Sequence, residues 1–67
     1  MHDIVVNGVA RQAQAGQTLL ELLRDLELEP SRVAVEMDRR IVKRTEWETL
    51  ELGPGVRLEI VQFVGGG

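Results

Sequence analysis

One leucine stripe constrains the fold of this chain more than any other feature of its sequence. Four leucines recur at i, i+3, i+4 and i+7, which is the spacing of one face of a helix. Thr18 and Glu21, at the start of the stripe, have the spacing of a capping box. Pro30 prevents the helix from continuing, so we expect it to run from residue 19 to residue 27 or 28. The stripe consists of Leu19, Leu22, Leu23 and Leu26.

A hairpin pattern precedes this helix. The β-branched segment 4–6 and the segment 9–14 flank Asn7-Gly8, a dipeptide preferred in tight hairpin turns because both positions need positive φ. Segment 9–14 is the more polar of the two, and we therefore expect it at an edge of the sheet.

Further strand patterns follow the helix. Gly53-Pro54-Gly55 suits a turn, because proline presets φ at its second position and glycine tolerates positive φ at its third. Thr45 is expected to cap a single helical turn over residues 46–48. The expected strands cover residues 32–37, 41–42 and 56–63.

This order of elements predicts an α+β fold. The first and last strands are the most apolar, so we expect them at the centre of a mixed sheet of four to five strands, with one main helix on one face. This is the β-grasp, or ubiquitin-like, arrangement. A chain of 67 residues forms one domain. We assign the β-grasp domain to residues 1–63 and a flexible C-terminal glycine tail to residues 64–67.

The composition excludes several classes of function. Without cysteine there is no disulfide, thiolate metal site or thiol nucleophile, and His2 is the only histidine. The net charge of −3 gives no support for nucleic-acid binding, and no apolar run approaches the ~20 residues that span a membrane. We expect a cytoplasmic protein that is not an enzyme, has no catalytic or metal-binding residues and binds neither nucleic acid nor membrane.

The parity of the last strand predicts an exposed apolar patch. Side chains alternate along a strand, so Val61 and Phe63 face water if the even-numbered residues face the helix. Val5 is expected to join them if the first and last strands pair, and Val64 extends this partner-docking surface. A β-bulge would reverse the parity and bury Phe63, which is the alternative that parity alone leaves open.

The sequence ends on three glycines. Residues 64–67 reach at most ~13–14 Å when extended, and Gly65 and Gly66 have no Cβ, so the walls of a partner's channel can close around their backbone. We interpret Gly65 and Gly66 as threading a partner's active site and the carboxylate of Gly67 as the reactive group. From the glycines alone, an unordered end or a cloning remnant is the alternative.

Each of two charged clusters could either serve a function or simply face water. Segment 39–44 contains Arg39, Arg40, Lys43 and Arg44, which would suit an acidic partner or, less well, RNA. Isolated charge runs usually only face water. The glutamates at 46, 48 and 51 surround no expected pocket, and Trp47 is expected to fix its irregular segment to the core.

Several short motifs occur in a characteristic order. They are Asn7-Gly8, Gly16-Gln17-Thr18-Leu19 leading into Glu21-Leu22-Leu23, Val33-Ala34-Val35-Glu36, Ile41-Val42 with Arg44 and Trp47, and Leu58-Glu59-Ile60-Val61 through Gly66-Gly67. Their order and spacing resemble the bacterial sulfur-carrier proteins of thiamine biosynthesis, the ThiS family. The resemblance covers essentially the whole chain.

The resemblance implies a carrier rather than a catalyst. In the family, an E1-like adenylyltransferase uses ATP and magnesium to adenylate the terminal carboxylate, which here belongs to Gly67. Sulfur from a cysteine-desulfurase relay replaces the AMP to give a thiocarboxylate, and thiazole synthase takes that sulfur into the thiazole of thiamine. The carrier itself is expected to bind no cofactor.

Two other functions remain open from the sequence. One is a sulfur carrier for molybdopterin synthesis, cysteine synthesis or tRNA thiolation. The other is a non-catalytic ubiquitin-like interaction module. The identity of the sulfur donor and the oligomeric state have no signal in the sequence.

Overall fold

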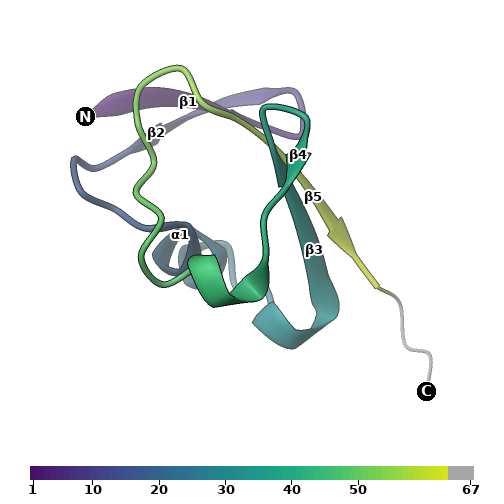
Figure 1. Ribbon diagram of the computed structural model, residues 1–67. Helices are drawn as coiled ribbons and strands as arrows, with labels where there is room; N and C mark the ends of the chain where they lie inside the picture. The colour runs from purple at the N-terminus through teal and green to yellow at the C-terminus, as the bar shows by residue number, and fades with distance from the viewer. Residues whose placement is uncertain (64–67) are drawn as a thin grey trace.

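The last strand that the structure describes lies in the middle of a five-stranded sheet (Figure 1). The computed structural model describes residues 1–63, and the strands are ordered β2-β1-β5-β3-β4. Strands β1 and β5 are parallel, whereas every other neighbouring pair is antiparallel. The elements are β1 (His2–Val6), β2 (Val9–Ala13), α1 (Leu19–Asp25), β3 (Val33–Met37), β4 (Arg40–Ile41) and β5 (Arg57–Gln62), with the short 3-10 turns η1 (Pro30–Arg32) and η2 (Arg44–Glu46).

This arrangement confirms the predicted α+β, β-grasp architecture. Within residues 1–63, α1 is the one α-helix, and it lies on one face of the mixed sheet (Figure 1). The apolar strands β1 and β5 are inside the sheet and the polar strand β2 is at an edge, as their composition predicted.

Strands β1 and β2 form the predicted hairpin. Asn7 has a φ of 50° and Gly8 a φ of 80°, the positive values that a primed turn requires. Val6 pairs with Val9 directly across this turn. The turn therefore sets the register of the whole hairpin. Strand β2 ends at Ala13, one residue before the expected end.

Helix α1 begins as the capping box predicts but ends earlier than expected. Thr18 Oγ1 accepts a hydrogen bond from the backbone N–H of Glu21 at 3.2 Å, and Glu21 Oε1 accepts one from the N–H of Thr18 at 2.9 Å. The predicted end at residue 27 or 28 is wrong, because Glu27 has a φ of 59° and the helix stops at Asp25. The N–H of Leu28 then donates to the carbonyl of Leu23 at 2.9 Å, which satisfies a free carbonyl at the helix end.

The core lies between α1 and the inner face of the sheet. Trp47 belongs to it, at 3% exposure, and its indole Nε1 donates to the carbonyl of Val42 at 3.1 Å. The prediction that Trp47 fixes its irregular segment is therefore confirmed. The buried hydrophobic residues are Ile4, Val6, Ala13, Leu19, Leu22, Leu23, Val33, Val35, Val42, Trp47, Leu52, Val56, Leu58 and Ile60.

Some expected boundaries in the second half of the chain are wrong. Turn η2 has no side-chain cap and begins before Thr45, so Thr45 lies inside the turn instead of capping one at residues 46–48. Strands β4 and β5 differ by about one residue at their ends from the expected 41–42 and 56–63, because terminal residues lose their ladder partners first. The turn before β5 is as expected, with a φ of 78° at Gly55.

Candidate functional site

The candidate site is the end of β5, where the chain continues into its final residues. The expectations for Val64, Gly65, Gly66 and Gly67 lie outside the residues that the structure describes. What the structure describes is residues 60–63, which we call the tail root.

Strand β3 holds the tail root from one side. Val61 pairs with Ala34, and Gln62 pairs with Val33. Just past the end of the strand, the N–H of Phe63 donates to the carbonyl of Arg32 at 2.7 Å. The antiparallel pairing therefore continues to the last described residue.

A side chain holds the tail root from the other side. Strand β1 ends at Val6, and the N–H of Asn7 donates to the carbonyl of Leu58 at 2.8 Å. The Asn7 carboxamide then bonds Ile60 twice: Nδ2 donates to its carbonyl at 3.1 Å, and Oδ1 accepts from its N–H at 2.7 Å. The sequence analysis treated Asn7 only as a turn residue, and the sequence carries no signal for this long-range contact.

The outer face of the tail root is apolar and exposed. Val61 is 58% exposed and Phe63 54%, whereas Leu58 and Ile60 on the opposite face are buried. The exposure predicted from strand parity is confirmed, and the bulge that would have buried Phe63 is absent from the described part of β5. Their role in docking stays a prediction.

Val5 does not belong to this exposed pair. It is only half-buried on β1, and its neighbour on β5 is Arg57. Arg57 lies four residues before Val61, which corresponds to about 13 Å along a strand. Val5 therefore shares the outer face with Arg57, as expected, but it does not lie beside Val61, because β1 pairs with the beginning of β5 rather than with its end. Its role in docking stays a prediction.

Arg44 is not a free member of the basic segment 39–44. Its guanidinium donates to the carbonyls of Pro30, Ser31 and Val33, the last at 2.9 Å, and lies 5.1 Å from the ring centre of Trp47. It therefore ties η2 to the start of β3. The other basic side chains of this segment, Arg39, Arg40 and Lys43, are exposed.

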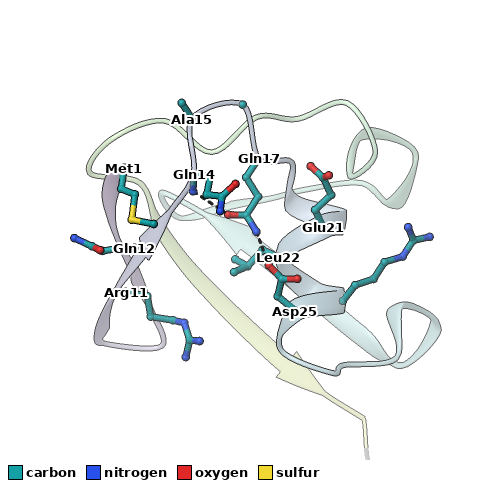
Figure 2. Close-up of a pocket in the computed structure, with 11 residues that line it drawn as sticks. Met1, Arg11, Gln12, Gln14, Ala15, Gln17, Glu21, Leu22 and Asp25 are labelled. Carbon is teal, nitrogen blue, oxygen red and sulfur yellow. Dashed lines mark hydrogen bonds between the residues drawn. The ribbon is translucent and has the colours of Figure 1, made fainter.

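Elsewhere the described surface offers little chemistry. Within residues 1–63, no group of three or more His, Cys, Asp or Glu side chains is arranged to hold a metal ion. Figure 2 shows a shallow hollow between β2, the loop that follows it and α1. Its amide and carboxylate groups bond one another: Gln17 Nε2 donates to Asp25 Oδ2 at 2.8 Å, and Gln17 Oε1 accepts from the N–H of Gln14 at 3.1 Å. No residue of β5 lines this hollow.

The fold and the position of the site define a ubiquitin-like β-grasp protein whose central strand leads into the final glycines. The family model described as "ThiS family" matches residues 4–67. This chain belongs to the ThiS family, and the resemblance stated from its motifs is confirmed.

Individual relatives agree with this assignment. The sulfur carrier protein ThiS of Escherichia coli is 33% identical over 65 residues, which cover 97% of this chain and 98% of that protein. The crystal structure of the thiamine biosynthesis protein ThiS from Geobacter metallireducens superposes with a TM-score of 0.81 at 25% identity, covering 97% of this chain and 99% of that one.

A longer relative is also similar. A thiazole synthase of Paramagnetospirillum magneticum is 38% identical over 64 residues, 96% of this chain but 20% of that protein. This chain therefore spans about a fifth of the length of that relative. Among residues 1–63, no helix has the length and apolar character needed to cross a membrane.

Proposed function

We propose that this protein is a sulfur carrier of thiamine biosynthesis and that the carboxylate of Gly67 carries the sulfur. The observation that carries the proposal is the family match, which extends from residue 4 through Gly67 and includes the three glycines. The similarity to the E. coli sulfur carrier over nearly the full length of both proteins supports it. In this role the protein is consumed and regenerated by enzymes and is not itself a catalyst.

The proposed chemistry activates an unreactive group. A carboxylate resists attack by sulfur because it has no good leaving group. An E1-like adenylyltransferase would let a carboxylate oxygen of Gly67 attack the α-phosphorus of ATP, with release of pyrophosphate. The outer sulfur of a persulfide, delivered by a cysteine-desulfurase relay, would then attack the acyl-adenylate and displace AMP, which gives an acyl disulfide. A thiol reductant would cleave this disulfide, releasing the thiocarboxylate and becoming oxidised to a disulfide itself. ATP and magnesium are bound by the partner, and this chain needs no cofactor of its own.

The tail root is the docking surface of this proposal. Val61 and Phe63 expose apolar side chains immediately before residues 64–67. Exposed apolar side chains grouped beside a functional group are typical of contact sites, and aromatic residues often dominate binding energy. The proposal includes Val64 in the partner contact. Gly65 and Gly66 have no side chains, so the walls of a partner's channel could close around their backbone.

Thiazole synthase is the proposed acceptor of the sulfur. A protein named for that activity contains a segment 38% identical to this chain, and the presence of both parts in one protein supports a functional link. We place the reaction in the cytoplasm, because the activation step consumes ATP.

Pyrophosphate release tests the proposal. The cognate adenylating enzyme, ATP and magnesium are incubated with the protein ending at Gly67, and with a control that lacks Gly67. We expect release that depends on the intact protein and is lost with the control. Equal release with both forms would contradict the assignment of the reactive carboxylate.

A further inference from the structure

The pairing of β1 with β5 continues beyond the end of β1. One residue after β1 ends at Val6, the backbone N–H of Asn7 donates to the carbonyl of Leu58 at 2.8 Å. The chain then turns away, with a φ of 50° at Asn7. The Asn7 side chain nevertheless supplies both the donor and the acceptor for Ile60, at 3.1 and 2.7 Å.

Asparagine is suited to this position by two separate properties. It tolerates positive φ better than most residues, because its short polar side chain bonds nearby backbone. Its carboxamide also carries one acceptor oxygen and a donor NH₂, the same pair of groups as a peptide unit. Glycine would satisfy the first property alone, and aspartate would satisfy the first and supply only the acceptor.

Around Ile60, strand β5 is bonded on both sides: Ile60 itself bonds Asn7, and the residues that follow it pair with β3. On the β3 side, the pairing continues past Ile60 to the bond from the N–H of Phe63 to Arg32. On the β1 side, the bonds from Asn7 are the last ones that the described residues make to β5. Without them, the strand beyond Leu58 would be held by β3 only.

We propose that Asn7 is a positioning residue for the carrier reaction: by bonding Ile60, it fixes the position of the end of β5, from which the chain continues to Gly67. This inference rests on the proposed function, since it matters only if Gly67 must enter a partner. If the tail root already has a fixed conformation before the partner binds, fewer residues lose conformational freedom on binding. Each additional residue that must be ordered on binding weakens binding by roughly tenfold.

The strand offers a matched control at its other end. Asp38 has the same φ of 50°, and its Oδ1 accepts a hydrogen bond from the N–H of Arg57 at 3.1 Å. Asn7→Gly and Asp38→Gly each keep a residue that accepts positive φ and each remove side-chain bonds to β5. They differ in which end of the strand is released.

Adenylation kinetics separate positioning from stability. We expect Asn7→Gly to raise the KM for the carrier by about tenfold with kcat within about twofold, because the ordered complex is the same once formed. Asp38→Gly should leave both parameters close to those of the unaltered protein. An equal rise in KM for the two glycine variants, or no rise for Asn7→Gly, would overturn the proposal.

Amide hydrogen exchange tests the same idea without any partner. The N–H groups of Val61 and Phe63 are expected to exchange faster in Asn7→Gly than in Asp38→Gly, although Asn7 bonds neither of them. Equal exchange in the two variants would overturn the positioning role, whatever the adenylation assay shows. If the unaltered protein is not adenylated at all, the proposed function fails, while the exchange result still decides whether Asn7 fixes the tail root.

Discussion

Within residues 1–63, four residues other than glycine adopt positive φ: Asn7, Glu27, Asp38 and Arg39. At two of these positions the residue also makes a long-range contact: the side chains of Asn7 and Asp38 form hydrogen bonds with the backbone of β5. Glu27 follows the end of α1, where a left-handed residue closes the helix. A long side chain has no conformational advantage there, so Glu27 costs stability that the helix end itself does not require.

Glu27→Gly should therefore stabilise the protein. A left-handed conformation costs a residue with a Cβ about 1–2 kcal/mol, and the greater freedom of glycine in the unfolded chain offsets part of that gain. We expect a net increase in the free energy of unfolding of up to about 1 kcal/mol, measured by urea denaturation. An unchanged or lower value would mean that the Glu27 side chain contributes contacts that outweigh the backbone cost.

Phe63→Ala should separate binding from stability. Phe63 is 54% exposed, so we expect a loss of less than about 1 kcal/mol in the free energy of unfolding, against ~3–5 kcal/mol for a buried phenylalanine. Binding to the adenylating enzyme should weaken by about tenfold, as for an aromatic residue at the centre of an interface.

Ile41→Ala is the control for this prediction. Ile41 is 80% exposed but lies on the edge strand β4, away from the tail root, so its truncation should change neither quantity appreciably. Equal losses of binding in both variants would show that Phe63 has no special role in docking.

At the scale of elements, β5 depends on both of its neighbours. It is the central strand, and its end is positioned by the junction of η1 and β3 on one side and by the β1–β2 turn on the other. Arg44, which is remote from that junction in sequence, stabilises it directly. Its guanidinium donates to three carbonyls on either side of Arg32.

Arg44→Ala should destabilise the protein by about 1–3 kcal/mol, because it removes several charge-assisted hydrogen bonds and a cation–π contact with Trp47. Arg44→Lys should recover little of this loss, since an ammonium group does not reproduce the planar fork of donors. Lys43→Ala, the neighbouring control, should stay within about 0.5 kcal/mol. Comparable losses for Lys43→Ala and Arg44→Ala in urea denaturation would contradict this role.

Local signals predicted the elements, whereas long-range contacts did not appear in the sequence. The start of α1 was predictable because Thr18 and Glu21 bond within one turn. Its end was not, because a glutamate took the position where glycine usually marks a helix end. The exposure of Phe63 followed from alternation alone, but the separation of Val5 from Val61 depends on the register between strands far apart in the chain. The contacts of Asn7 and Arg44 could not be predicted for the same reason, because they join residues that are far apart in the sequence.

At the scale of the whole molecule, the structure describes residues 1–63, and the proposed reactive group lies beyond them in the sequence. The buried side chains that the structure describes all lie between Ile4 and Ile60. Changes within residues 64–67 should therefore affect partners more than the fold.

Gly66→Val tests this separation. We expect an unchanged thermal midpoint, because every buried residue that the structure describes is unaltered. We also expect at least about a tenfold loss of adenylation, because a β-branched side chain cannot enter a close-walled channel without clashes that cost more than ~1.4 kcal/mol. A normal adenylation rate would show that no such channel closes around the backbone of Gly66.

The central claim is that Gly67 carries sulfur. The most direct measurement is the intact mass of the protein after incubation with the adenylating enzyme, ATP, magnesium and a sulfur source, followed by fragmentation to locate the change. We predict that the mass rises by the difference between one sulfur and one oxygen atom and that the change maps to Gly67. An unchanged mass with active partners, or a modification that maps to a lysine, would contradict the account.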